Sequence, residues 1–206
     1  MMRAIAAVLA LALPACANAP EASLYPEERG EAPPGICGIP GMVGETNRTI
    51  QGRINGCGLE DGVQVTQVAG VTLSQGASMD CRTARALHDW VTGSAKPTLS
   101  GRGGGLMRLE VAAGYACRTR NNRPGGRVSE HGKGRAIDIS GFTLRDGTTL
   151  TVLRDWRGGD SRLLKRMHRE ACGPFKTVIG PDGDRYHQDH FHFDTARRRN
   201  GSSYCR

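Results

Sequence analysis

The chain has 206 residues, which is long enough for one domain with its own hydrophobic core. Aromatic residues make up only 5% of it and glycine occurs 29 times, so we expect short strands and many loops rather than long helices. A formal net charge of +8 indicates anionic surroundings, such as phospholipid, nucleic acid or an acidic cell envelope. Outside the N-terminus, the sequence predicts no membrane-spanning segment.

Residues 1–19 are typical of an export signal. A short positively charged start precedes residues 4–13, which are uninterruptedly apolar but too few to span a bilayer. Residues 13–16, Leu-Pro-Ala-Cys, resemble a bacterial lipobox, in which Cys16 would carry a lipid. Two alternative sites within residues 15–19 fit ordinary signal peptidase cleavage. We therefore expect an exported, periplasmic protein, either soluble or anchored to the outer membrane through Cys16.

A flexible linker follows at residues 20–35, which are rich in Pro, Glu, Ala and Gly. The folded domain is predicted over residues 36–206, as a lead-in at 36–78 and a main core at 79–206. Short apolar stretches in the lead-in predict small strands or an irregular segment held by a disulfide.

Two helices are predicted in the main core. The first spans 79–91, is capped by Asp80 and buries Ala84, Leu87 and Val91 on one face. The second spans 160–171, begins near Asp160 and buries its Leu and Met residues at 163, 164 and 167. His88 and His168 are interpreted as a surface or boundary residue and as a solvated residue, respectively.

Strands are predicted at 106–117, 136–142, 150–153, 178–179 and 190–194. Strands that alternate with few helices predict an α+β fold with a small, mainly antiparallel sheet and flanking helices.

Seven cysteines indicate an oxidising compartment. With Cys16 lipidated or removed, six remain for three disulfides: Cys37, Cys57, Cys81, Cys117, Cys172 and Cys205. None of these six has C-x-x-C spacing, which argues against a cysteine zinc site. Because Cys37-Gly38-Ile39 and Cys57-Gly58-Leu59 are similar, Cys37 and Cys57 are predicted to pair.

Three of the six histidines lie within residues 187–192, His-Gln-Asp-His-Phe-His. Side chains alternate along a strand, so His190 and His192 would face a cleft while Phe191 and Phe193 face the core. A polar outer face on an edge strand would give the same pattern. His187 is interpreted as a surface residue or a neighbour of the site.

The segment 129–138, Ser-Glu-His-Gly-Lys-Gly-Arg-Ala-Ile-Asp, carries a second histidine and an acid. Asp138 lies in an apolar strand, where a carboxylate is costly to bury unless it is paired or binds a cation. Arginine or backbone donors could satisfy it, but a metal would explain both Asp138 and the nearby His131. Two His and one Asp suit a catalytic zinc with one position open for water.

The segment matches every fixed position of S-x-H-x-x-G-x-A-x-D, the signature of the D-Ala-D-Ala peptidases in the group that includes lysostaphin and the hedgehog signalling domain. More closely, the chain resembles the bacterial extensin-like C-terminal family over residues 36–206. The matching blocks are residues 115–118, 129–138, 171–172 and 189–192.

The resemblance implies that Zn²⁺ is held by His131, Asp138 and His192, with a hedgehog/D-Ala-D-Ala peptidase-like fold. It implies Asp189 or His190 as the general base. The second motif of the group is either E-x-x-H or H-x-H, and Asp189 is one methylene shorter than Glu, so His190 fits better.

The resemblance also implies roles for polar residues near the metal. Arg118 would contact the substrate and the oxyanion, with Arg120 competing for that role and Ser129 lining the site. The implied activity is a zinc peptidase that hydrolyses peptidoglycan stems or cross-links.

Two other functions remain open at this stage. One is a non-catalytic, zinc-containing module of the same fold that binds cell-wall peptide. The other, a nucleic-acid binder, is disfavoured by the export signal and by the lack of aromatic residues interleaved with arginine. We expect a monomer that binds no nucleic acid.

Overall fold

The computed structural model describes residues 35–206, so the predicted export signal, Cys16 and residues 20–34 of the linker lie outside the described residues. Residues 35–206 belong to one compact unit. Among residues 35–206, no helix is long and apolar enough to cross a membrane.

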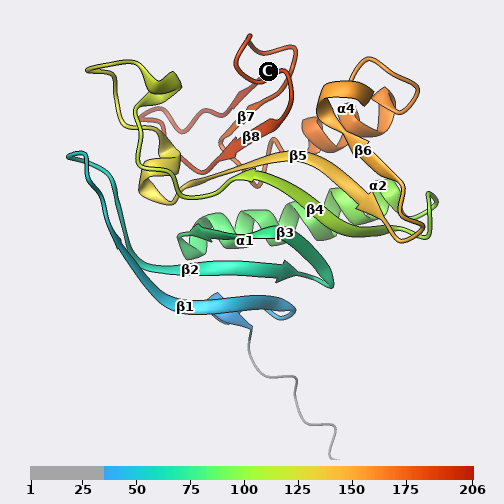
Figure 1. Ribbon diagram of the computed structural model, residues 1–206, viewed down its shortest axis with the longest axis horizontal. Coiled ribbons are helices and arrows are strands. Elements are labelled where there is room, and N and C mark those ends of the chain that lie inside the picture. The colour runs from blue at the N-terminus through green and yellow to red at the C-terminus, as the bar shows by residue number, and fades with distance from the viewer. Residues whose placement is uncertain (1–34) are drawn as a thin grey trace, which may run out of the picture. The chain divides into compact units, whose positions relative to one another are not determined.

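The centre of this unit is a nine-stranded mixed sheet in the order β1-β2-β3-β4-β5-β8-β7-β9, with β6 paired to β5 (Figure 1). The strands are β1 (Met42–Gln51), β2 (Gly58–Val68), β3 (Val71–Met79), β4 (Leu106–Ala113), β5 (Ala136–Leu144), β6 (Thr149–Thr151), β7 (Thr177–Ile179), β8 (Phe191–Asp194) and β9 (Tyr204–Cys205). Only the β3–β4 and β7–β9 pairings are parallel. The α+β class and the mainly antiparallel sheet agree with the prediction, but the sheet is larger than expected because the lead-in contributes β1 to β3 to it.

The main helical segment follows β3 directly. Asp80 caps α1 (Cys81–Trp90), because its carboxylate accepts a hydrogen bond from the Thr83 amide at 2.7 Å. The chain continues through a π-helical turn, η2 (Val91–Ala95), into α2 (Lys96–Leu99). Ala84, Leu87 and Val91 are fully buried, so both the predicted helix and its core-facing side are confirmed.

Five further helices lie in the described residues. They are η1 (Ile36–Gly38), η3 (Arg120–Asn122), η4 (Glu130–Lys133), α3 (Val152–Asp155) and α4 (Ser161–Glu170). Trp90 of α1 joins the layers, since its indole packs edge-on against Phe193 of β8 and donates a hydrogen bond to the Met167 carbonyl of α4.

The prediction that His168 is solvated is wrong. Only 8% of His168 is exposed, and its ring packs against Trp156 and Phe191. Burial disfavours the charged imidazolium and lowers the pKa of His168 to about 4. The charged neighbours in the sequence are misleading here, because His168 directly follows Met167 and shares its buried side of α4.

Three disulfides are present within residues 35–206, as predicted, but their connectivity differs from the predicted pairing. They join Cys37 to Cys81, Cys57 to Cys117 and Cys172 to Cys205. Cys37 and Cys57 do not pair, because Cys37 lies beside the start of α1 while Cys57 lies between β1 and β2, close to the segment that follows β4. Similarity of two short sequence segments therefore did not indicate their proximity in space.

Candidate metal centre and cleft

Two neighbouring strands position the acid and one histidine of the site. In the antiparallel β5–β8 ladder Asp138 is the register partner of His192. Phe191 and Phe193, on the opposite face of β8, are fully buried. The alternation predicted for this strand is confirmed for residues 191–193, although the strand begins at Phe191 and not at His190.

A short 3-10 turn supplies the other histidine. Ser129 caps η4 by accepting a hydrogen bond from the His131 amide at 3.4 Å, and Gly134 ends the turn with a left-handed φ of 63°. A residue with a side chain would adopt that φ less readily, which explains a glycine at this point of the segment. The turn delivers a His131 side chain that is fully buried.

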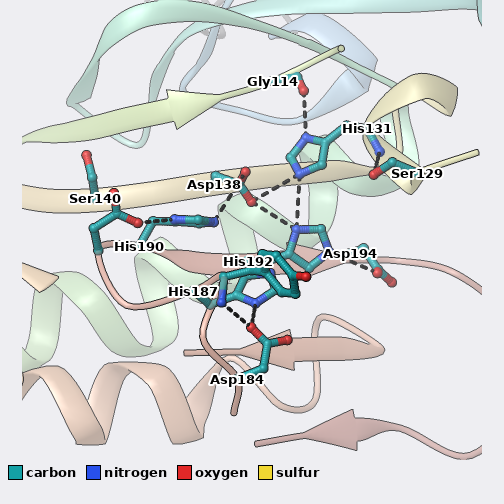
Figure 2. A network of polar contacts seen from close by, with 12 residues as sticks. Gly114, Ser129, His131, Asp138, Ser140, Asp184, His187, His190, His192 and Asp194 are labelled. Carbon is teal, nitrogen blue, oxygen red and sulfur yellow. Dashed lines mark hydrogen bonds and ion pairs between the residues drawn. The ribbon is translucent and has the colours of Figure 1, made fainter. Parts of the chain in front are cut away.

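Three ligand-type atoms converge at the centre of the site (Figure 2). His131 Nε2 lies 3.0 Å from Asp138 Oδ1, His192 Nδ1 lies 2.9 Å from the same oxygen, and the two histidine nitrogens are 3.0 Å apart. Each of these residues offers one atom that could hold a metal ion.

The outer nitrogens of both histidines are engaged elsewhere. His131 Nδ1 lies 2.7 Å from the Gly114 carbonyl, and His192 Nε2 lies 3.1 Å from Asp194 Oδ2. Because a carbonyl and a carboxylate can only accept, each outer nitrogen carries the proton. In the neutral rings the inner nitrogens are then lone-pair acceptors, and they face a third acceptor, Asp138. Such a set favours a positive charge at its centre, and outer N–H groups held by oxygen are typical of metal-binding histidines.

The pKa shifts of Asp138 and His192 agree with a positive charge between the inner atoms. Burial alone would raise the pKa of Asp138, but hydrogen bonds and charges from His131 and His192 outweigh it and hold that pKa far below its ordinary value. Burial would lower the pKa of His192, but the carboxylates of Asp138 and Asp194 raise it to about 9. A positive charge is therefore favoured between the inner atoms, whether a proton or a metal ion supplies it.

His190 lies beside the three ligand-type atoms, and Asp189 does not. His190 Nε2 is 3.6 Å from Asp138 Oδ2, while His190 Nδ1 is 2.7 Å from Asp189 Oδ1. The Asp189 side chain is 66% exposed and is not among the residues that line the cleft. The structure thus places Asp189 where it can orient His190, from the loop that precedes β8.

His187 lies closer to the site than its interpretation as a surface residue suggested. Its ring is mostly buried, with its centroid 5.6 Å from that of His192, and its Nδ1 lies 2.7 Å from Asp184 Oδ1. Figure 2 shows this Asp184–His187 pair beside His192.

The candidate ligands lie in a cleft of about 880 Å³ that is rich in arginine. Arg118, Arg120 and Ser129, for which the family resemblance implies a place near the substrate, all line this cleft. Arg118 is half-buried, whereas exposed Arg120 lies 3.6 Å from the buried Glu130 carboxylate. Ser129 is buried and caps η4, so its position in the structure is that of a support for His131.

Several residues of the site were missed at the sequence level. Asp194 could have been found, because it lies two positions after His192 on the same strand and the two side chains therefore share a face. Gly114 contacts His131 through its backbone carbonyl, and Asp184 contacts His187 from a loop. Arg197 and Arg198 line the cleft because the chain returns to it after β8. No side-chain pattern in the sequence indicated these four residues.

The fold and site describe a disulfide-bonded α+β protein with a candidate His-Asp-His metal centre in a basic cleft. The chain belongs to the extensin-like protein C-terminus family, whose model matches residues 41–206. No curated protein and no solved structure matches the chain.

Proposed function

We propose that this protein is a zinc-dependent peptidase that hydrolyses peptide bonds in the stems or cross-links of peptidoglycan. The observation that carries the proposal is the convergence of three acceptor atoms, from His131, Asp138 and His192. The outer N–H groups of the two histidines are already held by Gly114 and Asp194. The S-x-H-x-x-G-x-A-x-D segment and its resemblance to the D-Ala-D-Ala peptidase, lysostaphin and hedgehog group support zinc, a fold of that kind and peptide-bond hydrolysis. The predicted export signal supports a periplasmic site of action, with a lipid anchor at Cys16 as an option.

The residues of the cleft have separate roles in the proposed hydrolysis. When bound, zinc would supply the Lewis acidity that makes water a nucleophile near neutral pH. His190 accepts the proton of the attacking water, with its ring oriented by Asp189, and later returns that proton to the leaving amine. Arg118 binds a substrate carboxylate through paired hydrogen bonds. The bound metal would help to stabilise the oxyanion that forms during attack.

Metal analysis combined with a digest tests the proposal. The purified protein should contain one zinc per chain, and incubation with purified peptidoglycan should release fragments that mass analysis assigns to hydrolysed peptide bonds. His192→Ala should contain no metal and release nothing, whereas His88→Ala, altered outside the cleft, should match the wild type. Metal-free protein that still releases fragments would contradict the proposal.

A non-catalytic, zinc-containing module that binds wall peptide is the second candidate. One observation favours it: the acid of the second motif, Asp189, is exposed and does not line the cleft, so catalysis rests on His190 alone. In the digest this candidate predicts protein that contains zinc and sediments with peptidoglycan but releases no fragment from any wall preparation.

A further inference from the structure

A second group of arginines lines the cleft, in the segment between β8 and β9. The run Arg197-Arg198-Arg199 is interpreted from its sequence as an ordinary solvated surface, and all three residues are exposed. Arg197 and Arg198 nevertheless line the same cleft as the candidate metal ligands, and Arg199 does not.

Arg198 is held by neutral groups. One of its guanidinium nitrogens lies 3.4 Å from Thr177 Oγ1, and the guanidinium carbon lies 5.3 Å from the centre of the Tyr204 ring. Tyr204 precedes Cys205, which the disulfide to Cys172 ties to the end of α4. Among residues 35–206, the arginines that form ion pairs do not include Arg197 or Arg198. A guanidinium fixed in this way keeps most of its donors available for an anion.

The backbone at Arg118 is held in place in the other segment that lines the cleft. It follows Cys117, which is bonded to Cys57, and its carbonyl accepts a hydrogen bond from the Ser129 amide at 2.9 Å. Like Arg198, Arg118 forms no ion pair with another residue of the described part of the chain.

The two arginines belong to segments that are connected to different candidate ligands. The Arg118 segment leads through Ser129 into the turn that carries His131. Arg198 contacts Thr177, whose register partner Asp194 lies 3.1 Å from His192. A ligand that contacts both guanidiniums therefore reaches from the His131 side to the His192 side of the centre.

We propose that the cleft binds a peptide with two carboxylates, one held by Arg118 and the other by Arg198, so that the peptide lies across the candidate metal centre. The proposal rests on the proposed function and narrows it. A substrate anchored at both ends presents an internal bond, which favours cleavage of a cross-link over removal of a terminal residue. The two guanidiniums select carboxylates over their amides, because an amide offers no charge and only one acceptor oxygen.

Three synthetic probes test the inference: a cross-linked stem peptide with one free carboxylate on each strand, and its two singly amidated forms. In wild-type protein each amidation should lower kcat/KM by about 10- to 100-fold, the usual range for losing a charge-assisted hydrogen bond. Arg198→Gln should lower kcat/KM for the dicarboxylate probe by a similar factor. Amidation of one of the two strands should then have no further effect on kcat/KM, whereas amidation of the other strand should still lower it. Arg118→Gln should become indifferent to amidation of the other strand, and Arg199→Gln should match the wild type.

Binding to chelator-treated, metal-free protein, measured by calorimetry, gives the same comparison without turnover. In each arginine variant, the measured affinity should no longer depend on amidation of the one carboxylate that this arginine binds. Arg198→Gln that discriminates among the probes as Arg199→Gln does, with native circular dichroism, would overturn the inference. Tight binding without cleavage would contradict the proposed peptidase activity but support the two-carboxylate site. Cleavage of all three probes at equal rates would support the peptidase activity but contradict the two-carboxylate site.

Discussion

Asp138 and His192 lie directly opposite each other in the antiparallel β5–β8 ladder, with Asp138 Oδ1 2.9 Å from His192 Nδ1. A shift of one residue in this register would turn His192 into the core and Phe191 or Phe193 into the cleft. The buried phenylalanines of β8 therefore hold the candidate ligand in register, and the stability of the core and the geometry of the site depend on the same strand.

The contact between His192 and Asp194 should control metal affinity. Asp194→Asn removes the carboxylate that orients the imidazole, so metal affinity should fall by about 10- to 100-fold without being abolished. Competition with a chromogenic chelator measures the affinity. Asp184→Asn, which alters the acid beside His187, is the matched control and should leave affinity unchanged. Equal affinities for Asp194→Asn and the wild type would show that this contact does not support a metal ligand.

His190 should be required for catalysis but not for metal binding. His190→Ala should retain one equivalent of metal and lose about 10²–10⁴-fold in peptide hydrolysis, the usual contribution of a general base. Asp189→Ala should lose less, because the exposed Asp189 carboxylate acts through His190. Metal content and digestion rates are measured on the same preparations. An inactive Asp189→Ala beside a fully active His190→Ala would instead identify Asp189 as the base.

The Cys57–Cys117 disulfide should support the cleft more directly than the other two. Cys57 Sγ packs against Gly132 of η4, and Cys117 precedes Arg118. The disulfide closes 60 residues, so the Cys57→Ser/Cys117→Ser double variant should lose about 4 kcal/mol of unfolding free energy. It should also raise KM.

Urea titration and steady-state kinetics measure the two effects. The Cys172→Ser/Cys205→Ser variant tests in the same way the disulfide next to Tyr204, which contacts Arg198. The Cys37→Ser/Cys81→Ser variant is the control, which should lose stability but keep a KM near that of the wild type. Two or more reactive thiols in the denatured wild-type protein would contradict the three-disulfide framework itself.

Acid should destabilise the protein through His168. Burial lowers the pKa of His168 to about 4, below its ordinary value of 6.5, so the unfolded chain binds the proton more readily. The stabilising effect of the neutral ring is complete above pH 6.5 and is lost progressively as the pH falls toward 4. At pH 4.5 the unfolding free energy should be lower by about 2 kcal/mol from this residue.

The measurement is urea unfolding at pH 7.5 and 4.5 in the presence of a chelator, so that loss of metal does not contribute. His168→Gln cannot titrate and should show a smaller difference between the two pH values. Parallel pH dependences for the variant and the wild type would exclude His168 as the source. Because both proteins keep the histidines of the cleft, titration of those residues cancels in the comparison.

The local patterns of the chain determined much of this structure. The cap at Asp80, the buried face of α1 and the alternation of Phe191, His192 and Phe193 follow from helical and strand periodicity, which depends only on neighbouring residues. The resemblance of residues 129–138 and 189–192 to known motifs implied that His131, Asp138 and His192 belong to one site, and the structure brings these side chains together. That they bind a metal stays a prediction.

Only the tertiary structure decided which distant segments meet. The partners of Cys37 and Cys57, the burial of His168 against Trp156, the Gly114 carbonyl that holds His131, and the entry of Arg198 into the cleft all join residues far apart in the chain. Such contacts arise from the packing of whole strands and helices around one core. A carbonyl or a guanidinium therefore acquires its role from its position in the fold, which no short sequence pattern records.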